Sequence, residues 1–400
     1  MNLIQDRLDV RVKKRANVFN WRGQFTPEFI EYLIDSLTTT GNEYIADPFS
    51  GSGTVLFEAA QKNHSAIGLE INPAAYLMSK FYTLSSIPFA ERIELLRDFE
   101  FILKANIQDL NGAAVYNGNK DYRIAYKNLI QFGKQLSENI NETQHKILLL
   151  NLLFMSEKDK KLSLKESVLK SFNRLESAFV GLPHSEANID AQLQDARMLG
   201  TLCKEKVDLI ITSPPYINVF NYHQNYRAIV EAFNYDILKV AHSEFGSNRK
   251  NRSNRLRTVV QYCLDMEQSL LSFWEALKSG GKMVLVVGRE SNVRKTPFYN
   301  GKIVSQIIEY SQGFGELQNL ERSFTNKFGA DIKEDILVAT KTNTSIQGNS
   351  AREIAKESLK NAFEHAPNDV KSDFHEIFET IDTVKPSPIF NKKHIFSKHG

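Results

Sequence analysis

The 400-residue sequence predicts an α/β protein: a doubly wound, Rossmann-like sheet with a helical insertion and a small C-terminal helical appendage. Two observations support this fold class. Short apolar runs that end at turn-forming residues alternate with stretches of helical periodicity. The run 43–47 leads into a glycine-rich loop, and the run 207–212 ends at two prolines. Ligands bind at the carboxyl ends of strands in such sheets, so both loops are candidate binding sites.

Residues 43–70 form the first predicted unit, a strand, a glycine loop (47–54, DPFSGSGT), a helix and a second strand that ends at Glu70. Nucleotide-binding units place a ribose-binding carboxylate about 20 residues after the first strand. The third glycine of the dinucleotide fingerprint is missing, and Asp47 would repel a pyrophosphate. A cofactor with a ribose, a positive charge and no phosphate fits better, which indicates S-adenosylmethionine. Gly51 and Gly53 would then let the backbone approach it, and Asp47 would face its cationic end.

The next segment, about 80–188, is predicted to be an inserted helical subdomain. Apolar residues recur at three- and four-residue spacing over 90–107, 122–138, 142–154 and 162–179, with few glycines or prolines between them. Beyond it, strands are expected near 190–194, 207–212, 282–287 and 335–340, in addition to those near 43–47 and 66–70.

The tetrapeptide Ser-Pro-Pro-Tyr at 213–216 directly follows the apolar run 207–212. Its two prolines fix two φ angles and remove two backbone N–H donors. The residue before each proline is pushed out of the helical region, so the segment is stiff and rich in acceptors. Such an edge suits a flat ring that carries an amine, with Ser213 accepting from the NH2 group and Tyr216 stacking on the ring. The alternative is a strand followed by a simple Pro-Pro turn.

Together these motifs resemble the S-adenosylmethionine-dependent DNA amino-methyltransferases, which methylate cytosine N4 or adenine N6. Residues 47–54 resemble the cofactor loop of that family, 70–72 its ribose-binding acid and 212–216 its catalytic motif. The outer matches are less specific and comprise 19–27 (FNWRGQFTP), 195–197, 277–287 and 335–340. The resemblance covers about residues 15–75 and 190–342.

The resemblance implies a role for each matching residue. The cofactor-binding residues would be Phe25, Thr26, Asp47, Pro48, Phe49, Gly51, Gly53, Thr54, Glu70, Asn72, Asp195 and Ala196, with Asp195 contacting the adenine amino group. The catalytic residues would be Ser213, Pro214, Pro215 and Tyr216. The family usually has serine in this motif for cytosine N4 and aspartate for adenine N6. Ser213 therefore favours cytosine, with adenine as the alternative.

The expected substrate is double-stranded DNA, from which the target base must be flipped out of the stack. Restriction–modification is the usual setting of the family, and it implies a separately encoded restriction endonuclease that acts on the same site. Three other classes remain open: an RNA methyltransferase, a protein-glutamine methyltransferase with a related Asn-Pro-Pro-Tyr motif, and a catalytically dead DNA-binding relative. The intact motifs argue against the last class, and Ser213 in place of asparagine argues against the second.

Basic residues gather between two predicted helices, 228–241 and 262–277, and no acidic residue lies among them. They are Arg249, Lys250, Arg252, Arg255 and Arg257. A polar, basic loop near an active site suits phosphate contacts, so these residues are the candidate DNA-binding set. The alternative is a solvated loop. The insertion 80–188 has two interpretations as well, target recognition over the DNA cleft or a bundle that supports the sheet.

The predicted organisation is therefore a cofactor half (1–79), the helical insertion (80–188), a catalytic half (189–342) and a C-terminal helical appendage and tail (343–400), with amphipathic helices over 351–363 and 369–380. A polar, aromatic segment at 218–227 either lines the base pocket or begins a helix.

Composition agrees with a cytoplasmic enzyme. No apolar stretch reaches transmembrane length, and the first residues lack the apolar run of a secretory signal, so no membrane association is expected. Two cysteines cannot form a disulfide framework, and no Cys/His spacing resembles a metal site. The net charge of +3 is too small to establish nucleic-acid binding by itself.

Overall fold

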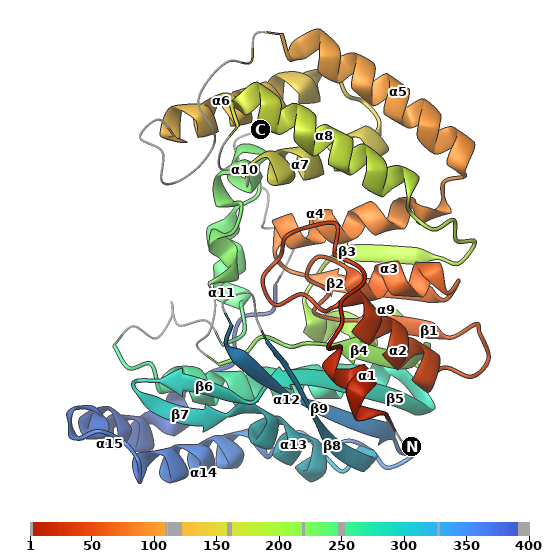
Figure 1. Ribbon diagram of the computed structural model, residues 1–400. Helices are drawn as coiled ribbons and strands as arrows, with labels where there is room; N and C mark the ends of the chain where they lie inside the picture. The colour runs from red at the N-terminus through yellow and green to blue at the C-terminus, as the bar shows by residue number, and fades with distance from the viewer. Residues whose placement is uncertain are drawn as a thin grey trace.

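The computed structural model describes residues 3–108, 110, 122–157, 162–217, 221–246, 253–325 and 329–390. A seven-stranded sheet forms the centre of the molecule, in the order β3-β2-β1-β4-β5-β9-β8 (Figure 1). Its strands are β1 (Tyr44–Asp47), β2 (Ser65–Glu70), β3 (Ile189–Leu193), β4 (Val207–Thr212), β5 (Leu277–Gly288), β8 (Phe314–Thr325) and β9 (Asp331–Lys341).

The sheet is parallel from β3 to β5, and β9 runs antiparallel to both of its neighbours. The chain builds outward from β1 through β2 to β3 and then returns to place β4 on the other side of β1. The strand order reverses there, and the paired register sets Ile45 beside Leu209. The carboxyl ends of β1 and β4 are therefore neighbours, and such a switch point is where doubly wound sheets bind ligands.

Helices cover both faces of this sheet, as a doubly wound fold requires. One face packs against α2 (Pro27–Leu37), α3 (Thr54–Gln61) and α4 (Pro73–Phe81), and the other against α9 (Leu199–Cys203), α12 (Arg257–Ala276) and α13 (Asn300–Tyr310). Successive residues of β4 point to opposite faces, so Leu209 and Ile211 join the first hydrophobic cluster and Ile210 the second. The predicted α/β, Rossmann-like fold class is confirmed.

Two features of the sheet region escaped the sequence pattern. The edge strand β8 is mostly polar, because one side of it stays exposed, and it therefore has no apolar run to mark it. A separate hairpin of β6 (Glu290–Val293) and β7 (Thr296–Tyr299) has strands of only four residues each, too short to show a clear pattern.

The segment between β2 and β3 supplies the four expected helices, α5 (Phe89–Asn106), α6 (Tyr122–Glu138), α7 (Thr143–Ser156) and α8 (Leu164–Val180), after the short turn η1 (Tyr82–Ser86). They form a layer above α4 (Figure 1). Asn151 of α7 donates to the Leu77 carbonyl at 2.9 Å, which fixes α7 to α4. Arg92 is buried and donates to the carbonyls of Ser85 and Pro183, so it joins both ends of the segment.

Further helices complete the described part of the chain. They are α1 (Gln5–Asp9), α10 (Arg227–Ala232), α11 (Ile237–Ser243), α14 (Ala351–Phe363) and α15 (Lys371–Thr380), with short turns η2 (Ala196–Met198), η3 (Tyr222–Gln224), η4 (Asn368–Val370) and η5 (Ile381–Thr383). The helix α14 packs against α12 and α13, and α15 packs against α14, far from α5–α8 (Figure 1). No helix in the described ranges is long and apolar enough to cross a membrane.

Candidate active site

A pocket of roughly 1000 Å³, part of it open to solvent, lies over the carboxyl ends of β1, β2, β3 and β4. Its lining comprises Trp21–Phe25, Asp47–Ser52, Thr54, Leu69–Asn72, Gln194–Ala196, Ser213–Tyr216, Tyr222, Glu244 and Phe245. The pocket therefore brings together residues of both predicted motifs, which are far apart in the sequence. Among the expected cofactor residues, Gly53 and Thr26 are not part of its lining.

Three backbone amides of the glycine loop are already bonded within the protein. Gly51 N donates to Glu70 Oε2 at 3.0 Å, and Ser50 N donates to the Leu69 carbonyl at 3.0 Å. Gly53 N donates to the Ser50 carbonyl at 2.8 Å. A pyrophosphate site needs free N–H groups at this position. The amides of Ser50, Gly51 and Gly53 are therefore engaged within the protein and are not free to bind a pyrophosphate.

Gly53 is required by packing between helices. Its φ is +89°, and a Cβ atom there would lie 2.8 Å from Ser79 Cα and from a ring carbon of Tyr82. It caps the N-terminus of α3 against α4, outside the pocket. Thr26 likewise occupies the N-cap position of α2. Of the two predicted glycines, Gly51 is the one that lines the pocket.

Asp47 lies at the end of β1 and is 2% exposed. Its Oδ1 accepts a 2.6 Å hydrogen bond from the Thr212 hydroxyl and a 3.2 Å bond from Phe49 N. Burial outweighs these bonds and raises the pKa of Asp47 to about 7. The aspartate thus joins β1 to the strand that leads into the Ser-Pro-Pro-Tyr motif, and it is poised to ionise when a cation approaches.

Glu70 ends β2 and faces the same pocket. Its carboxylate accepts from Gly51 N and from Asn72 N at 2.8 Å, and each oxygen keeps a further lone pair. Burial raises the pKa of Glu70 to about 7, and the nearby charges of Asp47 and Glu244 add to the increase. A hydroxyl donor or a positive charge from a ligand would relieve this cost.

The polar groups of the pocket fit S-adenosylmethionine. Four acidic residues, Asp47, Glu70, Asp195 and Glu244, line it, and Arg22 is the one basic residue in its described lining. Ser50 Oγ and Glu244 Oε1 are buried without a hydrogen-bond partner in the described part of the chain. A cation with several hydroxyl and amine donors matches these acceptors, whereas a phosphate would be repelled.

The Ser-Pro-Pro-Tyr segment forms the pocket wall next to β4. The Tyr216 ring lies against Gly288 of β5, where a Cβ atom would be 2.6 Å from the ring. Its hydroxyl donates to Glu334 Oε1 at 2.8 Å, and Arg322 Nε donates to the other carboxylate oxygen at 2.7 Å. Burial raises the pKa of Tyr216 well above its usual value, so the phenol stays protonated. The sequence had suggested a role for the ring alone; the structure also gives the hydroxyl a partner.

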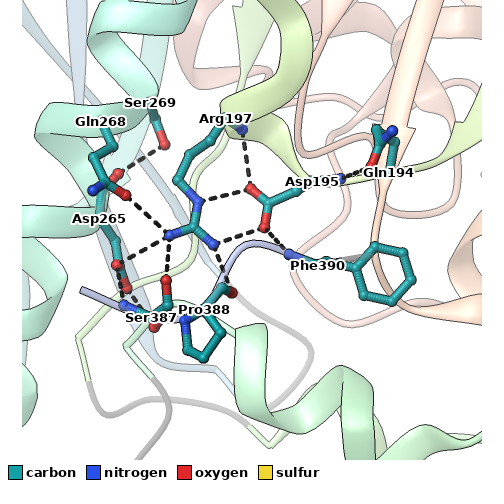
Figure 2. A network of polar contacts seen from close by, with 9 residues as sticks. All are labelled: Gln194, Asp195, Arg197, Asp265, Gln268, Ser269, Ser387, Pro388 and Phe390. Carbon is teal, nitrogen blue, oxygen red and sulfur yellow. Dashed lines mark hydrogen bonds and ion pairs between the residues drawn. The ribbon is translucent and has the colours of Figure 1, made fainter. Parts of the chain in front are cut away.

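Asp195 follows β3, and its carboxylate is held by the chain itself. Oδ1 accepts from Arg197 N at 3.0 Å and Nε at 2.8 Å, and Oδ2 accepts from Arg197 Nη2 at 2.7 Å and Phe390 N at 2.9 Å (Figure 2). Asp195 and Ala196 both line the pocket, as the family resemblance implies. The carboxylate, however, already accepts four hydrogen bonds from the protein, so these bonds compete with the expected contact to an adenine amino group.

The segment 221–246 covers the pocket and adds residues that the sequence did not assign to the site. Tyr222 stacks on Trp21 with ring centroids 6.0 Å apart, and its carbonyl accepts from Asn72 Nδ2 at 3.1 Å. Glu244 Oε2 bonds His223 Nδ1 at 2.7 Å. Phe245 packs edge-on against Phe49 at 5.3 Å. The polar, aromatic stretch after the catalytic motif was a signal for Tyr222; no local pattern marks Glu244 or Phe245.

The candidate DNA-binding loop is partly outside the described residues, since Arg249, Lys250 and Arg252 fall there. Arg255 is exposed. Arg257 begins α12, and its guanidinium donates to Thr383 Oγ1 at 3.0 Å and lies 3.6 Å from Glu376. Arg257 thus connects α12 to the C-terminal helices. In the described ranges, Cys203 and Cys263 are buried and free, and no group of three or more His, Cys, Asp or Glu side chains is placed to hold a metal.

Comparison with known proteins places the N-terminal part of the chain. Residues 5–81 match the DNA methylase family model. A Type II methyltransferase, M.MjaII, from Methanocaldococcus jannaschii is 31% identical over 70 residues, which span 18% of this chain and 13% of that protein. Both matches support the DNA amino-methyltransferase family and do not separate the N4 from the N6 type. The family match over residues 5–81 contains the glycine loop and Glu70.

Solved structures give a more distant likeness. An S-adenosylmethionine-dependent methyltransferase from Methanosarcina mazei is 10% identical, with a TM-score of 0.34 over 78% of this chain and 97% of that one. A putative RNA methyltransferase from Pyrococcus horikoshii is 11% identical, with a TM-score of 0.30 over 82% and 91%. The DNA methylase match, together with the acidic pocket, implies S-adenosylmethionine as the cofactor.

Proposed function

We propose that this chain is an S-adenosylmethionine-dependent DNA methyltransferase that methylates the exocyclic N4 of cytosine in duplex DNA. One observation carries the proposal: the glycine loop, Glu70 and the Ser-Pro-Pro-Tyr segment line a single pocket at the switch point of the sheet. A cofactor site and an amine-binding edge therefore face the same space. The DNA methylase match over residues 5–81 supports DNA as the substrate.

The cofactor supplies an electrophilic methyl group when it is bound. Glu70 would accept from its ribose hydroxyls, Asp47 would face its positive charge, and Asp195 and Ala196 would lie on its adenine side. The raised pKa values of Asp47 and Glu70, each about 7, make the free pocket ready for a cation. Phe49 and Phe245 form an apolar part of the pocket lining and pack edge-on against each other.

The chain's role toward the base is to orient a weak nucleophile. The lone pair of the cytosine amine is delocalised into the ring, so hydrogen bonds from its N–H groups to Ser213 and to a carbonyl of Pro214 or Pro215 would favour a pyramidal nitrogen. With S-adenosylmethionine bound, a C–N bond would form as the C–S bond breaks with its electrons kept by sulfur, and the nitrogen would lose one proton to solvent. Positioning provides most of the acceleration, since sulfonium is a good leaving group.

The amine must leave the base stack to reach this pocket, so we propose base flipping with Tyr216 beside the flipped ring. Neither cysteine is placed for a covalent adduct with the base, since Cys203 of α9 and Cys263 of α12 are both buried and are not part of the pocket lining. The amine chemistry needs no such adduct. The setting would be a restriction–modification system, with a separately encoded endonuclease acting on the same DNA site.

The proposal is tested by identifying the methylated base. DNA from cells that express the chain is digested to nucleosides, and N4-methylcytosine and N6-methyladenine are quantified by mass spectrometry. Expression of Ser213→Ala provides the matched control. N4-methylcytosine that depends on Ser213 supports the proposal. N6-methyladenine that depends on Ser213 would reassign the base, and methylation confined to RNA would remove DNA as the substrate.

A further inference from the structure

A segment near the C-terminus crosses the edge of the sheet that carries the pocket. We call residues 384–390 the strap. Val384 packs into the hydrophobic cluster that contains α12–α15, and Phe390 packs into the cluster on the other face of the sheet. The strap therefore spans both layers at the end of the sheet where ligands would bind.

Buried polar bonds fix the middle of the strap (Figure 2). The Asp265 carboxylate of α12 accepts from Ser387 N and from Ser387 Oγ, both at 2.6 Å. Arg197 Nη1 donates to the Ser387 carbonyl at 2.7 Å, and Nη2 donates to the Pro388 carbonyl at 3.0 Å. Phe390 N donates to Asp195. The strap thus contacts α12 and the turn after β3 at once.

These contacts supply hydrogen-bond partners to three buried charged residues. Asp195, Arg197 and Asp265 are 1%, 6% and 0% exposed, and their side chains place two carboxylates around one guanidinium. Buried charges that lose a partner are strongly destabilising, so each donor and acceptor of this cluster needs a bond. The strap supplies two acceptors to Arg197, two donors to Asp265 and one donor to Asp195. Without it, the cluster would open to water and lose its fixed geometry.

The same cluster shapes the wall of the pocket. Asp195 and Ala196 line the pocket directly. The Arg197 guanidinium lies 5.0 Å from the centre of the Phe245 ring, and Phe245 also lines the pocket. Phe245 in turn packs against Phe49 of the glycine loop. Arg197 therefore supports two separate parts of one wall and does not line the pocket itself.

We propose that the strap is needed for the shape of the cofactor pocket. Arg197 is a positioning residue: it bonds the strap and, through that bond, keeps Asp195, Ala196 and Phe245 in place in the pocket wall. The inference rests on the proposed function, because the wall in question is the one assigned to the adenine side of S-adenosylmethionine. It gives Asp195 a second role: its carboxylate anchors the strap, in addition to bordering the pocket.

The test uses two shortened chains. A chain that ends after Pro386 lacks Ser387–Phe390, and a chain that ends after Phe390 keeps every strap contact. We expect the first to bind S-adenosylmethionine at least about tenfold more weakly in calorimetry, and the second to match the full chain within about twofold. At saturating cofactor, the turnover of the first chain should be largely kept, so that the loss falls on KM.

Full-length variants serve as a second measurement that does not depend on truncation. Ser387→Ala removes one buried bond to Asp265, and Arg197→Lys removes the forked donor while it keeps the charge. Both should weaken cofactor binding by at least about threefold. Gln261→Ala is the matched control, because its side chain bonds the exposed Lys385 carbonyl and not the buried cluster; its affinity should be unchanged.

The outcomes separate the two proposals. A full chain that binds no S-adenosylmethionine overturns the proposed function. A full chain that binds it, with equal affinity in the chain ending after Pro386, in Ser387→Ala and in Arg197→Lys, overturns the role of the strap. If these variants lower the thermal unfolding temperature but leave the affinity intact, the strap is structural and the inference is wrong. If the shortened chain does not fold, the two full-length variants decide.

Discussion

At the scale of single residues, the free protein carries unfavourable charge in its pocket. Asp47 and Glu70 have pKa values of about 7, mainly because burial disfavours their ionised forms. A group whose pKa a cationic ligand lowers binds that ligand more tightly when it is ionised. The two carboxyls therefore link cofactor binding to pH in the neutral range.

We expect the affinity for S-adenosylmethionine to be highest above pH 7 and to fall as the pH drops below about 7, because Asp47 is then protonated in the free protein. Calorimetry over about pH 5.5–8.5 measures this dependence. Asp47→Asn should bind more weakly and lose part of the pH dependence. S-adenosylhomocysteine, which lacks the positive sulfur, should show a shallower decrease. An equal pH profile for wild type and Asp47→Asn would place Asp47 away from the charge.

Substitutions of Tyr216 can separate the role of its ring from the role of its hydroxyl. Its hydroxyl bonds Glu334, which Arg322 also holds, so Tyr216→Phe removes one buried hydrogen bond and keeps the ring against Gly288. We expect Tyr216→Phe to lower the free energy of unfolding by about 1 kcal/mol and to keep most of kcat, while Tyr216→Ala abolishes methyl transfer. Urea unfolding and steady-state kinetics check both. A Tyr216→Phe enzyme as inactive as Tyr216→Ala would give the phenol oxygen a catalytic role.

At the scale of elements, the sequence pattern predicts the strands whose own residues mark them, and it misses segments whose place depends on distant residues. The strands that end at Asp47, Glu70 and Thr212 were predictable because each is a buried apolar run beside a turn signal. The edge strand β8 was not, since its alternation is broken by exposed polar residues. The strap was missed for another reason: its partners at Asp195 and Asp265 lie far away in the sequence. Glu244 and Phe245 were missed for the same reason, because their partners in the pocket are also far away in the sequence.

The role of Gly53 is an element-level property, since it decides how closely α3 and α4 approach. Gly53→Ala would bring a Cβ atom to 2.8 Å from the Ser79 backbone at a φ of +89°. Gly41→Ala is the matched control, because Gly41 has a φ of +78° and no atom within 4 Å of the added Cβ. We expect a loss of about 1–2 kcal/mol for Gly41→Ala and about 1–3 kcal/mol more for Gly53→Ala. Equal losses in urea unfolding would show that the helices adjust at no cost.

At the scale of the whole molecule, the small net charge of +3 conceals a separation of charge. The pocket is lined by acidic residues, whereas the stretch 249–257 is basic and begins about 30 residues after Tyr216 in the chain. An acidic pocket suits a cationic cofactor, and a basic stretch elsewhere in the sequence suits phosphates. The helical layer α5–α8, whose helix α7 packs against α4, is the second candidate for holding DNA.

The basic loop is tested by the salt dependence of DNA binding. If Arg252 and Arg255 contact phosphates, replacing both with alanine should weaken binding to all duplexes alike. The slope of log affinity against log salt should become shallower by about 0.9 for each phosphate that is no longer neutralised. Lys62→Ala is the control for charge, because Lys62 pairs with Asp35 between α2 and α3. Loss of sequence preference with an intact slope would assign the loop to base readout. If neither quantity changes, DNA lies elsewhere, and substitutions on α5–α8 become the decisive experiment.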